Sequence, residues 1–309
     1  MVEKHHRIIS LLPGATEIVA ALGLREALVG RSHECDFPHG IESLPVCSEP
    51  VIDISASSAE INRQIEKSLE DALSIFRVDI ERIRQLRPTL ILTQMQCEVC
   101  AVNEKDVRLA IAGLSDSAPQ ILSLSPSVLD DLWRDITAVA ATVDSEAAGE
   151  ALVTSLQQRL GQLRDRVGIA ADRPRVACIE WLDPLMTAGN WVPELLDVAG
   201  CQNVLGKAGE HSPWLDWADL TEADADVILV FPCGFTLSRT RSEFPILAGH
   251  AEWSQLRAVR DGRVFLIDGH HYLNRPGPRL IDSAEIIAEI VHPDLFEPVH
   301  RDVAWSVCP

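Results

Sequence analysis

The sequence of 309 residues is poor in basic side chains and has only one tyrosine. Its 27 lysines and arginines stand against 46 aspartates and glutamates, which gives a formal net charge of −19 at pH 7. Nucleic-acid binding requires a basic surface that neutralises phosphates, and docking on an anionic membrane requires the same. The charge balance therefore argues against both classes and is typical of a protein kept in solution by its net charge.

Long apolar segments are also missing. No run of about 18 apolar residues occurs, so the sequence offers no candidate transmembrane helix. The first residues, MVEKHHRIIS, contain neither an apolar leader segment nor a small-residue cleavage site. We therefore expect a cytoplasmic location, with the periplasm as the alternative. The eight cysteines are scattered, and a chain of this length needs no disulfide framework.

Recognisable catalytic motifs are absent as well. The sequence has no G-x-S-x-G elbow, no phosphate-binding P-loop, no HExxH zinc motif and no glycine-rich dinucleotide fingerprint. One C-x-x-C pair is present, Cys97 and Cys100, without a second pair. A single pair specifies little, so a structural ligand loop, a metal site and a redox pair all remain open for it.

The sequence does contain a regular alternation of apolar strands and amphipathic helices. Apolar runs bounded by proline, glycine or polar residues predict strands at residues 8–12, 27–32, 89–93 and 120–124 in the first half, and at 175–181, 227–231 and 264–267 in the second half. Helical spacing lies between them. This rhythm predicts an α/β fold with parallel sheets, and the length predicts about two domains.

The rhythm breaks at residues 127–167, where apolar side chains recur at helical spacing over about 40 residues. A pattern of that length exceeds a typical globular helix. Two consecutive core helices and one rigid connector between two lobes both explain it, and Asp144 with Ser145 marks a point where the pattern is interrupted or recapped.

Polar residues gather where the predicted strands end. His33, Glu34, Cys35 and Asp36 follow one strand of the first half, and the segment with Cys97 and Cys100 follows another. The carboxyl ends of strands in an open α/β sheet are where ligands bind. We therefore expect these thiols, the imidazole and the carboxylates to share one edge.

The second half repeats this arrangement. Cys233 and Phe235 follow a strand, and a glycine between them permits close backbone approach to a ligand. Trp181 and Trp191 flank a polar loop, which suits a large flat ligand with polar fringes. The segment 269–279 is dense in hydrogen-bond donors. Its two adjacent histidines, His270 and His271, would point to opposite sides of an extended chain, so we expect at most one of them to line a site.

Five sequence blocks follow one another along the chain: ISLLPGATEI, LRPTLILTQ, RVACIEWLDPLMTAGNWVPELLDVAG, VILVFPCGF and NRPGPRLID. Together they resemble the cobalamin-type substrate-binding proteins of ABC importers, in the iron-siderophore and cobalamin periplasmic-binding superfamily. The HECD and CEVC clusters are similar to a leaderless subgroup. The resemblance covers nearly the whole chain. It implies two α/β lobes with mainly parallel sheets, residues 1–126 and 168–309, joined by a single long connecting helix over residues 127–167.

The same resemblance implies that a ligand binds between the lobes and that residues of both lobes contact it. These are Pro13, Thr16, Glu17, His33, Glu34, Cys35, Gln96, Cys97, Glu98, Trp181, Trp191, Cys233, Phe235, Tyr272, Asn274 and Arg275. It also implies docking on an ABC permease through one surface carboxylate of each lobe. Glu81 matches the first, and Asp219, or Glu222, is the candidate for the second.

Three functional hypotheses follow. The first is a receptor, not an enzyme, for cobalamin or a related corrinoid. The second is a receptor for a metal or a metal chelate, in which His33, Cys35, Cys97 and Cys100 hold zinc or another soft metal, because thiolates favour such ions. The third is an enzyme with a cleft cysteine as nucleophile or redox centre, which requires a basic neighbour that lowers the pKa of the thiol.

Overall fold

A computed structural model of the protein describes residues 6–71, 74–94, 107–108, 119–170 and 172–308. Contacts divide the chain into two compact units. The first comprises Met1–Ala56, Arg63–Pro126 and Asp130–Thr154, and the second comprises Ser57–Asn62, Ser127–Leu129 and Ser155–Pro309. Each unit has an α/β architecture, which agrees with the predicted fold class. The domain boundaries expected at residues 127 and 167 stay a prediction.

The first unit is built on a parallel sheet of four strands in the order β2-β1-β5-β6. Its strands are β1 (Ile8–Ser10), β2 (Leu28–Arg31), β5 (Leu90–Gln94) and β6 (Gln120–Leu124). The central strands β1 and β5 are buried along their whole length, because both faces of the sheet are covered. A second, antiparallel pair is formed by β3 (Ser48–Pro50) and β4 (Phe76–Val78).

The helix after β1, α1, spans Pro13–Ala21, and the expected site residue Thr16 lies inside it. Proline fits the first helical position because its missing N–H has no partner to lose there. The following helices are α2 (Ser58–Glu70) and α3 (Ile80–Leu86), and the side chain of Asp79 caps α3 by accepting from the backbone N–H of Arg82.

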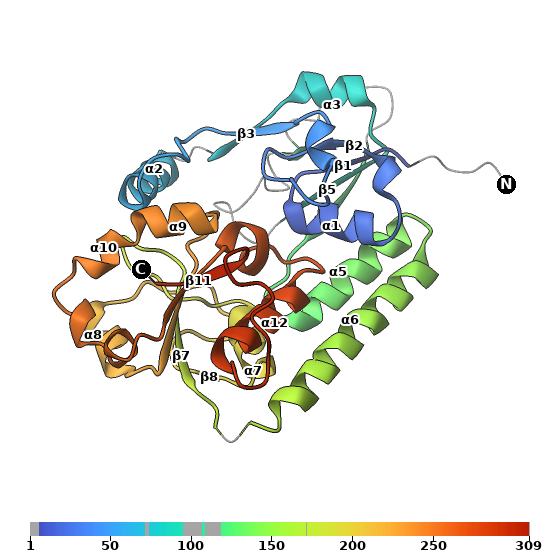
Figure 1. The fold of residues 1–309 in the computed structure, drawn as a ribbon. Coiled ribbons are helices and arrows are strands. Elements are labelled where there is room, and N and C mark those ends of the chain that lie inside the picture. Colours follow the sequence, from blue (N-terminus) through green and yellow to red (C-terminus); the bar gives the residue numbers. More distant parts are fainter. Residues whose placement is uncertain (1–5, 72–73, 95–106, 109–118, 171, 309) are drawn as a thin grey trace. The chain divides into compact units, whose positions relative to one another are not determined.

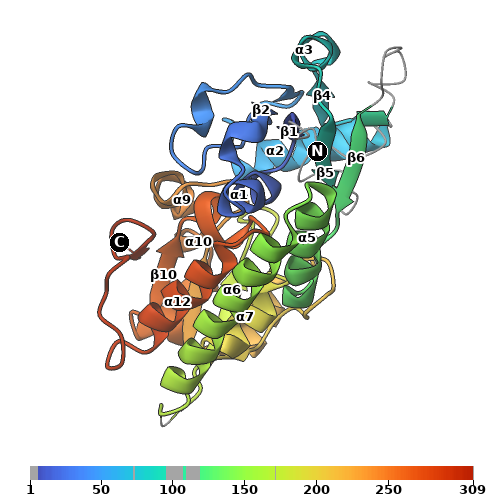
Figure 2. The same ribbon diagram turned by 90° about the vertical axis from the view of Figure 1, so that its right-hand side faces the viewer.

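The pattern expected to form one connecting helix forms two helices, α5 (Leu129–Thr142) and α6 (Glu146–Val167), which Figure 2 shows joined by a short turn. Asp144 adopts a left-handed conformation with φ 54°. The N–H groups of Asp144 and Ser145 donate to the carbonyls of Ala141 and Ala140, which is the Schellman ending of a helix. The boundary between the units, at Thr154 and Ser155, falls within α6, so a single helix still runs from one unit into the other.

The second unit contains a sheet of five strands in the order β11-β10-β9-β7-β8 (Figure 1). Its strands are β7 (Arg175–Ile179), β8 (Gln202–Asn203), β9 (Val227–Val230), β10 (Val264–Ile267) and β11 (Trp305–Val307). The first four are parallel, and β11 runs antiparallel to β10. Because β9 lies between β7 and β10, the segments that follow these three strands emerge at one edge.

The helices of the second unit are short except for the last. They are α7 (Val192–Val198), α8 (Trp217–Glu222), α9 (Leu237–Glu243), α10 (Pro245–Ala248), α11 (Arg257–Arg260) and α12 (Leu280–Val291). Helix α12 is largely buried and packs on α7. Three-residue 3₁₀ helices occur at Arg25–Ala27, Ile41–Ser43 and Trp253–Gln255. Within the described residues, no helix is both long and apolar enough to cross a membrane.

Candidate ligand-binding site

Three segments meet at the carboxyl edge of the second sheet, and they carry most of the side chains expected there. Glu180 follows β7, residues 231–235 follow β9, and Asp268 follows β10. The backbone N–H of Cys233 donates to the carbonyl of Glu180 at 3.0 Å, which ties the first two segments together. Gly234 then turns with φ 74°, the conformation that favours glycine. The edge is thus held by backbone contacts.

An aromatic and cationic group lies on this edge. The ring of Trp181 meets the ring of Phe235 edge-on at 5.3 Å between centroids. The guanidinium of Arg239, on α9, lies over the ring of Phe235, 3.7 Å from its centroid. A cation at this distance is attracted to the ring electrons. Sequence reasoning missed Arg239.

Trp191 stabilises a turn within the second unit. Its indole N–H donates to the carbonyl of Leu273 at 2.9 Å, and the residue is buried. The hydrogen bond joins the start of α7 to the turn that follows β10. The expected contact of Trp191 with the ligand stays a prediction, because its polar atom is already used to fix this turn.

A buried carboxylate stands next to these aromatics. Glu180 accepts a hydrogen bond from the Asn274 side-chain amide at 2.7 Å and another from the hydroxyl of Ser212. Glu180 is 7% exposed. Burying a charge without hydrogen bonds is costly, so these donors stabilise the carboxylate in place. Asn274 was an expected site residue, whereas Glu180 was not, although an acidic residue directly after five strand residues is the signal that could have found it.

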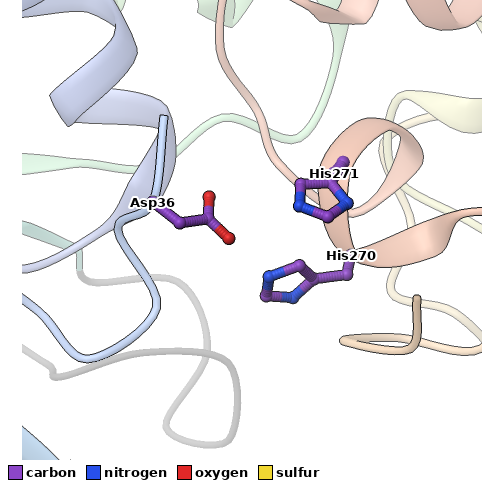
Figure 3. Close-up of side chains that lie close together, drawn as sticks. All are labelled: Asp36, His270 and His271. Atoms are coloured by element: carbon purple, nitrogen blue, oxygen red, sulfur yellow. The ribbon is translucent and has the colours of Figure 1, made fainter. Parts of the chain in front are cut away.

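The two adjacent histidines lie on a helical turn and not on an extended chain. Residues Gly269–Leu273 form one π-helical turn, a conformation often found at functional sites. Both rings therefore project to the same side and meet at 4.7 Å with an interplanar angle of 84° (Figure 3). The expectation that they point to opposite sides is wrong for this reason. Arg275, an expected site residue, donates from Nη2 to Nε2 of His270 at 2.7 Å.

His271 is paired with the carboxylate that begins this turn. Its Nδ1 lies 3.0 Å from Oδ2 of Asp268, and its backbone N–H donates to Oδ1 of Asp268 at 2.8 Å. Burial alone would raise the pKa of Asp268, but the hydrogen bonds and charge of His271 outweigh it and lower the pKa. Burial raises the pKa of the neighbouring Tyr272 phenol. Asp268 is therefore an anion that orients the imidazole.

The edge of the first unit brings two other expected residues together. Cys35, fully buried, has its Sγ 3.0 Å from Oγ1 of Thr16 and 3.2 Å from Oγ of Ser32. Pro13 starts the same helix that carries Thr16 and the buried Glu17. The neighbouring backbone N–H of Glu34 donates to Oγ of Ser32 at 3.2 Å. Asp36, labelled in Figure 3, belongs to the loop after β2.

His33 is a neutral imidazole in this setting. Its Nδ1 lies 3.2 Å from Oγ of Ser48, and its ring packs against Phe76 at 5.4 Å. Burial lowers its pKa to about 4, so it carries no charge near neutral pH. It therefore supplies no cation that would activate a thiol. Burial raises the pKa of Cys47 in the same unit to about 11, which is the opposite of a reactive thiol.

The remaining predicted site residues of the first unit lie outside the described residues. They are Gln96, Cys97, Glu98 and Cys100. The metal set of His33 and Cys35 with Cys97 and Cys100 therefore stays a prediction, as does the position of a ligand between the lobes.

The two carboxylates expected to dock on a permease are both exposed on short helices. Glu81 lies in the first turn of α3, where it pairs with Arg84. Asp219 accepts from the backbone N–H of Asp216 at 3.2 Å and so completes the capping box of α8. Asp219 thus has a structural function besides the docking function that stays a prediction.

Comparisons with known proteins agree with this arrangement. The family described as periplasmic binding protein matches residues 8–270. An uncharacterized ABC transporter substrate-binding lipoprotein of Bacillus subtilis is 24% identical over 299 residues, which cover 94% of this chain and 81% of that protein. A vitamin B12-binding protein of Vibrio cholerae is 26% identical over 285 residues, 90% of this chain and 86% of the relative. Among solved structures, a periplasmic heme binding protein from Pseudomonas aeruginosa superposes with a TM-score of 0.71 at 19% identity, covering 94% of both chains.

Proposed function

Because the chain belongs to the periplasmic binding protein family, we propose that it is the substrate-binding protein of an ABC importer and that its ligand is a corrinoid. Members of this family are solute-binding proteins and not enzymes, so the prediction of a receptor is confirmed. The observation that carries the corrinoid assignment is the similarity to the vitamin B12-binding protein of Vibrio cholerae, which extends over 90% of this chain.

The edge of the second unit supports this assignment. Trp181 and Phe235 are 8% and 1% exposed, so their edge-to-face pair forms an apolar support beneath this edge, and the guanidinium of Arg239 lies over Phe235. An aromatic pair of this kind adds about 0.5–1.5 kcal/mol beyond the burial of area, which holds the edge in place for a ligand. The carboxamide fringe of a corrinoid needs both donors and acceptors, and Asn274 with Glu180 supplies them close by.

Calorimetric titration tests the proposal directly. The purified protein is titrated with cyanocobalamin and with dicyanocobinamide, and we expect saturable binding of at least one of them. Trp181→Ala should weaken binding at least about tenfold, which corresponds to about 1.4 kcal/mol. Trp214→Ala is the matched control, because Trp214 is 59% exposed and should bind as the wild type does. Absence of heat and of spectral change at high micromolar corrinoid contradicts the proposal.

A metal chelate of the heme type is the second candidate. It is favoured by the similarity of the fold to the heme binding protein of Pseudomonas aeruginosa. Titration with hemin in the same experiment separates the two candidates: binding of hemin without binding of corrinoids establishes the second one. Elemental analysis of protein purified without chelators tests the simpler alternative, a zinc ion held by His33, Cys35, Cys97 and Cys100.

The names of the related proteins bear on the location of this protein and on its partner. They describe a lipoprotein and a periplasmic protein, which supports the periplasmic alternative over the expected cytoplasmic location. We propose Glu81 and Asp219 as the permease contacts. Glu81→Gln with Asp219→Asn should reduce transport while ligand binding is unchanged, because the asparagine oxygen still caps α8 by accepting from Asp216. Unchanged transport by the double variant contradicts the docking assignment.

A further inference from the structure

We propose that Glu243 links the ligand edge of the second unit to helix α2, so that a ligand on this edge steadies the start of α2 through Arg239 and Glu243. This inference rests on the proposed function for the ligand and goes beyond it, because it assigns a response of the protein to occupancy of the site. Glu243 is a positioning residue in this scheme: it acts on Arg239 and Ser58 and needs no contact with the ligand.

Helix α2 belongs to both units. Its start lies in the segment Ser57–Asn62 of the second unit, and from Arg63 onwards the chain is part of the first unit. The buried residues of α2 all lie in this start. Residues 58–70 contain no proline or glycine, where helices usually kink, so the start and the rest of α2 form one continuous helix. A change at the start therefore reaches the part that the first unit contains.

The start of α2 is held by a carboxylate of the second unit. The backbone N–H of Ser58 donates to Oε2 of Glu243 at 2.9 Å across 185 residues of sequence. The first N–H groups of a helix have no partner within it, and a carboxylate at this end is stabilised by the helix dipole. Ser58 is fully buried, and its hydroxyl has no hydrogen-bond partner among the described residues. Glu243 therefore supplies anchoring that the hydroxyl of Ser58 does not.

The other oxygen of the same carboxylate pairs with an arginine at the ligand edge. Oε1 of Glu243 accepts from Nε of Arg239, one turn earlier on α9, at 3.4 Å. The guanidinium of Arg239 in turn lies over the ring of Phe235, 3.7 Å from its centroid. The side chains of Arg239 and Glu243 are 26% and 15% exposed, so solvent screens this ion pair less than a pair on the open surface. One carboxylate thus connects an arginine of the candidate site to the start of α2.

The backbone that carries these two side chains is fixed at both ends of α9. At its start, the N–H of Leu237 donates to the carboxylate of Asp268 at 3.3 Å. At its end, the ring of Phe244 meets that of Trp253 edge-on at 5.5 Å between centroids. Because the helix is held, a ligand that packs on the edge restricts the side chain of Arg239 and does not move α9. The carboxylate that pairs with this arginine is then restricted too, and the N–H bond that it accepts opens less often.

A second helix start offers an internal control. The backbone N–H of Leu129, at the start of α5, donates to Oε2 of Glu194 at 2.6 Å. Residues Ser127–Leu129 also belong to the second unit. In the part of the chain that the structure describes, Glu194 forms no ion pair, whereas Glu243 pairs with Arg239. Both helix starts are thus held by a glutamate, but only that of α2 is held by a glutamate that an arginine positions.

Hydrogen exchange of single amides tests the link in the ligand-free protein. Arg239→Gln should speed exchange of the Ser58 amide about two- to fivefold, the range that a partly exposed ion pair supports, and leave the Leu129 amide unchanged. Glu243→Gln keeps an oxygen that can accept from Ser58 but loses the ion pair, so it should have a similar effect. Glu194→Gln is the matched control and should alter Leu129 only.

Two results of this comparison overturn the inference. One is exchange of the Ser58 amide that is unchanged in both Arg239→Gln and Glu243→Gln. The other is an acceleration of the same size at Leu129, which would show a general loosening of the protein. Circular dichroism of each variant shows that any change is not a loss of fold.

Ligand binding gives the second readout. The wild type is saturated with dicyanocobinamide or cyanocobalamin, or with hemin if the corrinoids do not bind. Exchange of the Ser58 amide should slow at least about twofold, and Arg239→Gln saturated with the same ligand should lack this slowing. A bound ligand that leaves the Ser58 amide unchanged overturns the inference and leaves the receptor standing. If no corrinoid binds, the proposed function fails, while the ligand-free comparison still decides whether Arg239 and Ser58 are linked.

Discussion

The side-chain amide of Asn274 donates to Oε1 of Glu180 at 2.7 Å across 94 residues of sequence. The bond joins the segment after β10 to the end of β7, and Glu180 is buried. It therefore connects two strand ends of the candidate site through a charged group whose burial has a high cost if a partner is removed.

We predict that Asn274→Asp destabilises the protein more than Asn274→Ala. Alanine removes one donor from the buried carboxylate, which costs about 1–3 kcal/mol. Aspartate removes the donor and adds a second negative charge beside Glu180, so the cost should rise to about 3 kcal/mol or more. Urea unfolding at pH 7.5 measures both. The gap should narrow at pH 5, because two adjacent carboxylates can share a proton; equal losses at pH 7.5 contradict the prediction.

The neutral His33 predicts a dependence of stability on pH. Burial lowers its pKa from 6.5 to about 4 in the folded protein. Between these values the unfolded chain binds a proton that the folded chain does not, so acidification from pH 6.5 towards pH 4 destabilises the fold. The contribution of this residue is about 3 kcal/mol, since one pKa unit corresponds to about 1.4 kcal/mol. His33→Gln should show a correspondingly flatter curve of unfolding free energy in this window, and parallel curves for the two proteins would refute the assignment.

The raised pKa of Asp135, on α5, predicts the opposite dependence of stability on pH. Burial raises its pKa from 3.8 to about 7, and its Oδ2 has no hydrogen-bond partner among the described residues. The folded protein therefore holds the proton more tightly, and this stabilisation is lost as pH rises through 7. Asp135→Asn should stabilise the protein at pH 8 by an amount on the order of 1–3 kcal/mol, reduced from the full shift because the group is only partly buried. The gain should vanish near pH 4.

The exposed Asp130 of the same helix gives the control for this experiment. Asp130→Asn should change the unfolding free energy by no more than about 0.5 kcal/mol at pH 8, as surface substitutions usually do. A gain from Asp135→Asn that is the same at pH 4 and pH 8 would show that charge burial is not its cause.

Two glycines with the same backbone conformation should respond differently to alanine. Gly206 has φ 72°, and an added Cβ would lie 2.1 Å from the carbonyl oxygen of Ala188. Gly262 has φ 67° and nothing within 4 Å of that position. Both changes bear the left-handed penalty of about 1–2 kcal/mol. Gly206→Ala should cost several kcal/mol more, because the backbone of the loop between Trp181 and Trp191 must move. Thermal unfolding compares them, and similar midpoints would contradict the close approach.

The α/β alternation could be predicted from sequence because the strands are short apolar runs with clear boundaries. The expected strand at residues 120–124 coincides with β6, and that at 264–267 coincides with β10. Asp144 and Ser145 marked a possible interruption of the pattern at 127–167, but the choice between one helix and two could not be made from sequence, because the Schellman ending uses backbone groups and no glycine or proline stands there. Strand β11 has three residues, and it exists because β10 offers an edge, which no local pattern reveals.

The candidate site, too, could be predicted from sequence only in part. Trp181 and Phe235 could be placed because each follows a strand, and residues after parallel strands share an edge. The pairing of Asp268 with His271 could not be placed, because it depends on the π-helical turn, in which residues three apart along the chain come into contact. Glu180 was missed because its partners, Ser212 and Asn274, are distant in sequence.

The segment that leads into strand β11 supports the turn that carries His271. The carbonyl of Ala304, just before β11, accepts the backbone hydrogen bond of Asp268, while the buried Glu289 holds Trp305 through its indole N–H at 2.6 Å and His300 through Nδ1 at 2.8 Å. A purification tag or a sensor-chip linkage after residue 309 is therefore attached close to the element that orients His271, and it can disturb that element. Immobilisation through an exposed lysine such as Lys207 leaves that element undisturbed, so apparent affinities measured by the two attachments should differ for reasons of handling and not of biology.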